Sequence, residues 1–459
     1  MLSGDELKKV FDRLKAQLIK QRVQCDTVDS WMRPELEAGF NLPRLATREH
    51  RRLRDFSRTP WLRLVVDNVV QAMYVDSLYS SEGKSAGLWD IWSRNSMSAR
   101  QVSNHRSMIA YGQSFAVVSK AEKYARVSLM SPRRMACEWD DPGDPFPKYA
   151  LESLRDENDQ QVFLLREPRF EYEVRTGRNI EGVQVVASRG TGISWVPVVR
   201  FANQLDLEGR VVGEVEPFIP SAQRINKTAY DRLLAQHFNS WKVKTVTGLD
   251  LPAKADPDTG LETDQVDVEA AEKMKIKLAQ DDILVGESPE TRFGVLEATS
   301  LEPFVSSWRA DIEALAASSQ TPAHALTGQL VNLSPEALAA ARSPLTQKVY
   351  ERQMNAGQSY TRVLQTAAAL EGDMGLAQDE RVRVSWQDME IRSMSQAVDA
   401  LGKAASMLKV PVRELWRLIP GVQSPDVEQW EAAADAELES DPLRASFARQ
   451  AQDTVSEVE

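Results

Sequence analysis

The chain has 459 residues, 42% of them hydrophobic, which is enough to form sizeable cores in about three structural units. Its net charge of −11, from 67 Asp and Glu against 56 Lys and Arg, argues against a protein that grips nucleic acid as a monomer, although DNA could still slide past it. There is no apolar run of about 18 residues and no signal-peptide core, so we expect a soluble globular protein of the cytosol without a membrane span.

The first part of the chain predicts helices separated by one arginine-rich stretch. Residues 5–24 have apolar side chains at helical spacing, and residues 87–94 and 99–110 fit two further helices. Thr59 as N-cap and Pro60 predict the start of another helix, which buries Leu62, Val65, Val66, Val69, Val70 and Met73. Residues 44–58 are rich in arginine and favour a solvated or ion-paired loop, with a contact to a partner or to DNA as the alternative.

From Gly112 to about Phe201 the apolar residues recur with a period of two. The runs are bounded by clusters of Pro, Gly and Asp, as half-buried strands are. We therefore expect a mixed, mainly antiparallel sheet packed on the preceding helices. Residues 140–145, Asp-Asp-Pro-Gly-Asp-Pro, predict a turn. A lone strand at 382–386 is expected to extend the same sheet.

The middle of the chain predicts two helices around a small insert. The first spans residues 217–241 and the second residues 301–319, and each has one apolar face. The insert combines a Pro- and Asp-rich excursion at 251–267 and a short helical patch at 268–277 with strands at 242–247, 283–285 and 293–296. This composition predicts a small α/β module.

A polar loop leads from the second helix into a much longer one. Ser334 and Pro335 predict a helix start, and apolar residues at helical spacing carry the helix to about Leu370. Pro344 removes a backbone donor inside this helix and predicts a kink, which also allows the helix to begin later than Ser334. From residue 393 the pattern is again helical, and the acidic end at 435–459 is expected to fray.

No catalytic constellation stands out. The two cysteines, Cys25 and Cys137, lie far apart without metal-ligand spacing and are expected to be buried free thiols, and no His pair has metal-binding spacing. The carboxylates Asp140, Asp141 and Asp144 could hold magnesium for phosphodiester chemistry, but solvated turns are the favoured interpretation. We expect no cofactor, no metal and no enzymatic activity.

Three passages in this order resemble the phage portal protein family, specifically the siphovirus-type portals in their actinobacteriophage-like branch. They are Thr-Pro-Trp-Leu-Arg-Leu-Val-Val-Asp-Asn-Val-Val-Gln-Ala-Met at 59–73, Glu-Pro-Phe-Ile-Pro-Ser-Ala-Gln-Arg-Ile-Asn-Lys-Thr at 216–228 and Ser-Ser-Gln-Thr-Pro-Ala-His-Ala-Leu-Thr-Gly at 318–328. The resemblance covers nearly the whole chain and implies an α+β portal fold.

The resemblance implies nine parts of the chain. They are an N-terminal helix with the arginine-rich segment at 1–58, a wing at 59–215, a first stem helix at 216–241, a clip at 242–298, a second stem helix at 299–319, a tunnel loop at 320–334, a long kinked helix at 335–371, a return strand of the wing at 372–392, and a helical crown with an acidic tail at 393–459.

The resemblance also implies where DNA and neighbouring subunits would be contacted. The tunnel loop would offer weak hydrogen-bonding groups to DNA from Gln320, Thr321, His324, Thr327, Gln329, Asn332 and Ser334. Light phosphate contacts are expected from Arg224, Lys227, Arg232, Lys242 and Lys244. The candidates for contacts between subunits are Ile225, Leu233, Phe238 and Trp308.

As a portal, the chain would form a dodecameric ring at one capsid vertex of the virion, after assembly in the host cytoplasm. The ring would conduct double-stranded DNA non-specifically during packaging and ejection. Its implied partners are the terminase large subunit, the head-tail adaptor, and the major capsid and scaffolding proteins. Two alternatives remain open at this stage: a metal-dependent nucleic-acid enzyme that uses the three aspartates, and a monomeric helical scaffold or adaptor.

Overall fold

The computed structural model describes residues 2–33, 35, 40–42, 44, 46–81, 86–154, 160–177, 180–239, 244–247, 253–255, 262–266, 292–295, 299–329, 335–387, 394–416, 418–419, 422 and 424–440. The chain forms two compact units. The larger comprises Met1–Gly39, Thr59–Gln223 and Ile312–Glu459, and the smaller comprises Phe40–Arg58 and Arg224–Asp311. Helices and antiparallel strands occur throughout, which confirms the α+β class.

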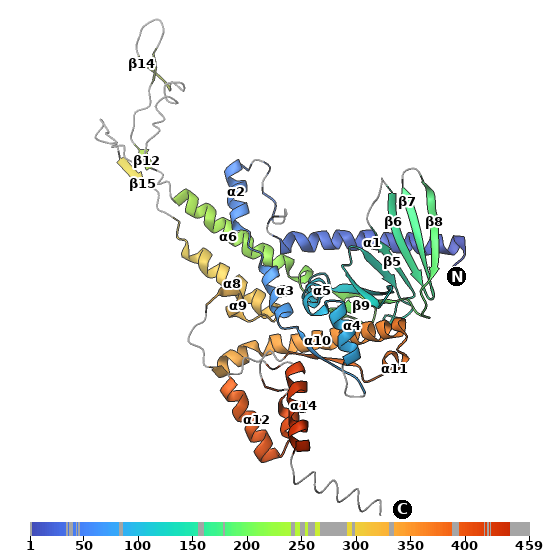
Figure 1. Cartoon of the computed structure of the whole chain (residues 1–459). Coiled ribbons are helices and arrows are strands. Elements are labelled where there is room, and N and C mark those ends of the chain that lie inside the picture. The colour runs from blue at the N-terminus through green and yellow to red at the C-terminus, as the bar shows by residue number, and fades with distance from the viewer. Residues whose placement is uncertain are drawn as a thin grey trace, which may run out of the picture. The chain divides into compact units, whose positions relative to one another are not determined.

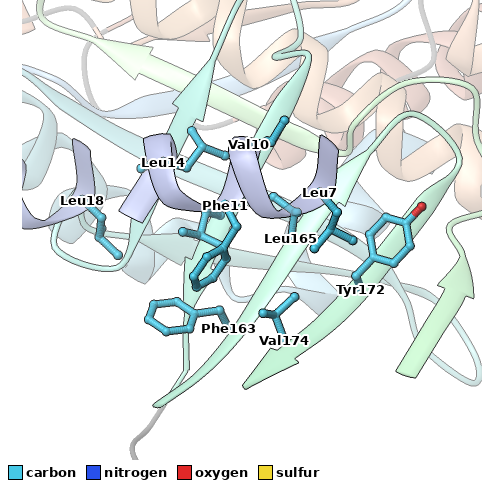
Figure 2. Packing of buried hydrophobic residues seen from close by; sticks show 11 residues of the cluster. Leu7, Val10, Phe11, Leu14, Leu18, Phe163, Leu165, Tyr172 and Val174 are labelled. Atoms are coloured by element: carbon cyan, nitrogen blue, oxygen red, sulfur yellow. The ribbon is translucent and has the colours of Figure 1, made fainter. Parts of the chain in front are cut away.

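In the larger unit, helix α1 (Gly4–Met32) covers a five-stranded antiparallel sheet in the order β4-β5-β6-β7-β8. Its apolar stripe, Leu7, Val10, Phe11, Leu14 and Leu18, shares one buried cluster with residues of β4, β5, β6 and β7. Figure 2 shows this stripe against the side chains of β6 and β7. The helix extends beyond the predicted 5–24 at its C-terminal end. The strands are β4 (Met135–Glu138), β5 (Tyr149–Ser153), β6 (Gln160–Glu167), β7 (Phe170–Gly177) and β8 (Ile180–Gly190).

A second sheet of the larger unit has three antiparallel strands in the order β3-β2-β9. They are β2 (Gln113–Lys120), β3 (Ala125–Met130) and β9 (Val198–Ala202). The strand region predicted as one sheet is therefore two. The long helix α10 (Pro335–Glu371) packs against all three strands (Figure 1). Its residues Ala356, Tyr360, Val363 and Ala367 are buried.

The helices α3 (Trp61–Gln71), α4 (Ala86–Arg94) and α5 (Met97–Tyr111) confirm three predicted segments, and all six apolar residues expected on the buried face of α3 are buried. Thr59 is not the N-cap, because the helix begins at Trp61 with Pro60 in that position.

The strand β16 (Arg383–Trp386) was expected to extend the earlier sheet, but it pairs antiparallel with β1 (Val75–Tyr79), with Leu78 opposite Val384. Strand pairing depends on which edge the chain reaches after α10, and local sequence does not encode that.

In the smaller unit the arginine-rich segment is not a loop. Thr47 caps helix α2 (Arg48–Ser57) by accepting a hydrogen bond from the backbone N–H of His50. The insert contains two antiparallel pairs, β12 (Lys244–Thr247) with β15 (Arg292–Val295) and β13 (Ala253–Ala255) with β14 (Glu262–Val266). The predicted excursion thus includes a strand pair, whereas the predicted helical patch at 268–277 and strand at 283–285 lie outside the described residues.

The remaining elements are short strands and C-terminal helices. The pair β10 (Gln204–Leu205) and β11 (Val211–Val212) precedes the single turn η1 (Glu216–Phe218), and α11 (Met374–Ala377) follows α10. The C-terminal helices are α12 (Met394–Leu408), α13 (Val412–Trp416) and α14 (Ser424–Ser440). Within the described part of the chain, no helix is long and apolar enough to cross a membrane.

Candidate functional site: two helices and the junction at their ends

Helices α6 (Ile219–Asn239) and α8 (Glu302–Ser318) correspond to the predicted helix pair around the insert. Within the smaller unit they are joined by a salt bridge, because Arg224 Nε donates to Asp311 Oδ1 at 2.7 Å. At the far end, Asn239 Nδ2 donates to the carbonyl oxygen of Thr299 at 2.8 Å, and the Thr299 N–H donates back to Asn239 Oδ1 at 3.1 Å. Side-chain contacts therefore hold the two helices together beside the insert.

The predicted DNA-contacting cations on α6 already have partners within the chain. Arg224 is paired with Asp311, and Lys227 with Asp231 one turn away. The guanidinium of Arg232 lies over the ring of Trp308, 5.4 Å from its centroid. Lys242 lies outside the described residues, and only the backbone of Lys244, in β12, is described. Partly neutralised cations of this kind favour weak, transient phosphate contacts over a tight clamp.

The four interface candidates differ in their exposure. Ile225 is 0% exposed and therefore packs inside its own chain, which removes it from a surface that could contact another subunit. Leu233 and Trp308 are half-buried and keep part of their surface accessible. The side chain of Phe238 lies outside the described part. Leu233 is consequently the best-defined apolar candidate for a subunit contact.

The predicted loop after α8 is partly helical. The short helix α9 (Ala323–Thr327) ends at Gly328, whose φ of 68° is the left-handed conformation that glycine adopts without strain. Gln320 and Gln329 are exposed, and Thr327 is half-buried. Thr321 is only 3% exposed, and its hydroxyl contacts the Ser319 hydroxyl, so Thr321 presents no donor to a ligand.

His324 of this segment is half-buried. It lines a cavity of about 650 Å³ together with Val349 and Tyr350 of α10 and Trp386 of β16. Asn332 and Ser334, the last two members of the predicted set, lie outside the described residues. In the described part of the loop, Gln320 and Gln329 are therefore exposed, and His324 and Thr327 keep part of their surface accessible.

The ends of the helix pair meet at a buried ionic junction that sequence reasoning missed. The Nζ of Lys348, in α10, lies 2.6 Å from Oε2 of Glu214. Glu214 lies just before η1 and α6 in the chain. The same ammonium donates to the carbonyl oxygen of Ser319, just after α8, at 2.9 Å. Arg352, one turn further along α10, donates to Glu214 Oε1 at 3.1 Å. One helix thus binds the chain on both sides of the pair.

Backbone packing fixes the position of Glu214. Its N–H donates to the carbonyl oxygen of Ile109 at 2.8 Å. A Cβ at the preceding Gly213 would lie 2.4 Å from the carbonyl oxygen of Ala110, so only glycine permits this approach of the chain to α5. Asn203 Nδ2 also donates to Glu214 Oε1, at 3.2 Å.

Charge neutralisation explains why Glu214 is ionised in a buried position. Burial by itself would raise the pKa of Glu214, but Lys348 and the hydrogen bonds from Lys348, Asn203 and Arg352 outweigh it, and the net pKa is lowered. Burial lowers the pKa of Lys348, and the negative charge of Glu214 opposes this effect.

The sequence does contain a signal for this buried junction. Lys348 and Arg352 interrupt the apolar stripe of the long helix at i, i+4 spacing.

The family model described as "Phage portal protein, SPP1 Gp6-like" matches residues 11–441 of this chain. The chain belongs to this portal family. Portal proteins are structural components of phage particles and connect head to tail. A solved chain titled "Neck of empty GTA particle computed with C6 symmetry" is similar at 10% identity and a TM-score of 0.45, covering 83% of this chain and 96% of that one. No curated protein matches the sequence significantly.

In this portal protein the three aspartates considered as metal ligands form a turn. Asp141 Oδ1 accepts from the Gly143 N–H at 2.7 Å, and Asp144 Oδ2 accepts from the Asp141 N–H at 3.0 Å. Asp140 pairs with Lys148 at 2.8 Å. Among the described residues, no three His, Cys, Asp or Glu side chains are grouped as metal ligands would be. The turn interpretation of this segment therefore accounts for each carboxylate.

The long helix of the portal protein begins at Pro335, as Ser334 and Pro335 predicted, and it contains Pro344. The alternative prediction, in which the kink at Pro344 makes the helix begin later, is wrong. Pro344 is exposed and lies one turn before the junction residue Lys348. Because proline lacks a backbone N–H, the helix is missing one hydrogen bond at this turn.

Proposed function

We propose that this portal protein forms a dodecameric ring at one vertex of the capsid and is the conduit for double-stranded DNA during packaging and ejection. The observation that carries the proposal is the portal family match from residue 11 to residue 441, which spans the helix pair, the insert and the long helix. The ring assembles in the host cytoplasm and becomes part of the virion.

The parts of the ring follow the element order. Residues 59–215 and 372–392 form the wing, residues 216–241 and 299–319 the stem, and residues 242–298 the clip that docks the terminase large subunit and later the head-tail adaptor. The tunnel loop is 320–334, the helix 335–371 joins it to the wing, and residues 393–459 form the crown. The salt bridge between Arg224 and Asp311 supports α6 and α8 acting as one stem, since it fixes the two helices to each other.

DNA passes through the channel of this ring without binding tightly to it. The stem cations Arg224, Lys227 and Arg232 each have an intrachain partner, and the loop groups Gln320, Thr327 and Gln329 are uncharged. Such groups form weak contacts that are exchanged as the phosphates advance. The ring hydrolyses no nucleotide, and its further partners are the major capsid and scaffolding proteins.

The deciding experiment is the mass of the purified protein by light scattering, combined with negative-stain imaging. Twelve copies of the 51.5 kDa chain weigh about 620 kDa, and a ring of that mass with a central hole is the expected result. Scaffolding protein and high concentration should be included, since identical acidic chains repel one another. A species that stays at the mass of one chain under all these conditions contradicts the proposal and favours a monomeric adaptor.

A further inference from the structure

A hollow of about 180 Å³ in the larger unit is lined by two arginines that have no carboxylate partner. Arg200 belongs to β9 and Arg362 to α10, and Asn355 and Gln358 line the same hollow from the helix face that carries Arg362. Within the described residues neither guanidinium forms a salt bridge, and Arg362 forms no hydrogen bond. A single water molecule needs roughly 10–15 Å³, so the hollow has room for a small polar ligand.

Three contacts hold Arg200 in place. Its Cζ lies 4.0 Å from the ring centroid of Trp139, and its Nη2 donates to the carbonyl oxygen of Pro142 at 2.9 Å. The carbonyl oxygen of Arg200 accepts from Ser359 Oγ at 2.8 Å, which joins β9 to α10 beside the hollow. A guanidinium has five N–H groups in a planar fork, so Arg200 keeps donors for a ligand after these contacts are made. This side of the hollow is therefore preorganised.

The two cations are close enough to destabilise each other. Burial lowers the pKa of Arg200, and the positive charge of Arg362 lowers it further. Burial also lowers the pKa of Arg362. Arginine nevertheless stays protonated in proteins, so the hollow holds two partly desolvated positive charges that repel each other. An anion bound between them would remove both costs.

A phosphate group fits this arrangement of charges. One carboxylate, that of Asp144, also lines the hollow, but its Oδ2 accepts from the Asp141 N–H at 3.0 Å and it forms no ion pair in the described part of the chain. Guanidinium forks match the oxygens of phosphate, which carries more negative charge than a carboxylate at neutral pH. We propose that the hollow binds a phosphate group between Arg200 and Arg362, with the Gln358 amide as a further donor. The site lies within one chain and does not rest on the proposed ring.

The test is isothermal titration of the full chain with inorganic phosphate, together with thermal unfolding in phosphate and in chloride at matched ionic strength. The wild-type protein should bind one phosphate per chain and unfold at a higher temperature in phosphate. Arg362→Gln and Arg200→Gln should each weaken binding about tenfold or more, because charge-assisted hydrogen bonds are lost. Arg126→Gln removes an exposed cation of β3 and is the matched control, which should bind as the wild type does. Asp144→Asn should tighten binding, because it removes the one negative charge that lines the hollow.

Stability in the absence of phosphate gives an independent readout. In chloride, Arg362→Gln should be at least as stable as the wild type, since it relieves the repulsion of Arg200, and only in phosphate should the wild type become the more stable protein. If Asp144→Asn destabilises the protein in chloride and leaves phosphate binding unchanged, Asp144 is the partner of Arg362 in solution and the hollow is not a ligand site.

Three further results would overturn the proposal. They are equal phosphate binding by Arg362→Gln and the wild type, an equal stabilisation of all variants by phosphate, which is a general salt effect, and binding of acetate as tight as that of phosphate. Where the site holds, a short DNA duplex identifies the source of the phosphate group. A duplex that displaces phosphate from the wild type, but does not bind Arg362→Gln, assigns the site to the DNA backbone, and a duplex that leaves phosphate bound assigns it to free phosphate.

Discussion

Lys348 and Glu214 form an ion pair with 2.6 Å between Nζ and Oε2, and both side chains are almost completely buried. Because Lys348 also binds the carbonyl oxygen of Ser319, this pair connects the long helix α10 to the chain just before α6 and just after α8. A shift of the chain at Glu214 or at Ser319 relative to α10 would have to break the buried ion pair or the hydrogen bond from Lys348. The junction therefore ties the long helix α10 to the chain on both sides of the α6–α8 pair.

Replacing Glu214 with Gln should destabilise the subunit by about 3 kcal/mol, because two buried cations, Lys348 and Arg352, lose their carboxylate. The measurement is urea unfolding of the single subunit. The triple variant Glu214→Leu, Lys348→Met, Arg352→Met should recover much of the loss, since no charge remains buried. The control Asp399→Asn breaks the exposed pair with Lys403 and should cost less than about 0.5 kcal/mol. Equal effects of Glu214→Gln and the control would contradict a buried junction.

Acid should destabilise the subunit through His105. Burial lowers the pKa of this residue to about 4, while its Nε2 contacts the Tyr360 hydroxyl at 2.9 Å. Between pH 6.5 and about 4 the unfolded chain binds a proton that the folded chain does not, so stability decreases as the pH falls through this range. The full effect is about 3 kcal/mol. Urea unfolding from pH 7 to pH 4.5 should show this slope, and His105→Gln should flatten it; an unchanged slope would exclude His105 as its source.

Leu233→Asp should abolish ring formation. The side chain is half-buried in the single subunit, so a contact with a neighbour would enclose a carboxylate without a partner. Light-scattering mass distinguishes rings from subunits. Leu207→Asp, at a position 99% exposed in the larger unit, adds the same charge and should leave rings intact. Rings that persist in the Leu233 variant would show that this face of α6 does not make the contact.

Gln329→Glu should reduce DNA retention in filled particles several-fold while rings assemble normally. The side chain is exposed after α9, and a carboxylate there in every subunit would repel the phosphates of passing DNA. Gln329→Ala should have a much smaller effect, and Gln184→Glu, on the exposed face of β8, is the control for added charge. Packaging assays with matched ring concentrations give the comparison. Equal retention by the Glu and Ala variants would argue against a channel position for Gln329.

Neither cysteine should react with a thiol reagent in the folded protein. Cys25 and Cys137 are buried free thiols, and burial raises the pKa of Cys25 to about 12 and raises that of Cys137 as well. Ellman's reagent at pH 8 should therefore detect almost no thiol within minutes, and two per chain after unfolding in guanidinium. Rapid reaction of one thiol in the native state would mean that its surroundings open on that timescale.

Local patterns predicted most of the individual elements. The periodic apolar residues of α1, α3 and α10 identified the helices and their buried faces, because a helix that packs on a core must place its apolar residues on one side. The pattern failed where local preference and tertiary environment differ. Residues 44–58 are dominated by arginine, yet the Thr47 cap and the inward positions of α2 make them a helix.

The sequence alone determined the α+β class, the helix pair around an insert and the start of the long helix, since these depend on propensity, periodicity and capping within a few residues of the chain. Only the tertiary structure decided that β16 pairs with β1, that the strands form two sheets, and that Glu214 meets Lys348 and Arg352. Glu214 and Lys348 lie more than a hundred residues apart, and a buried charge acquires its partner only when packing brings distant segments together.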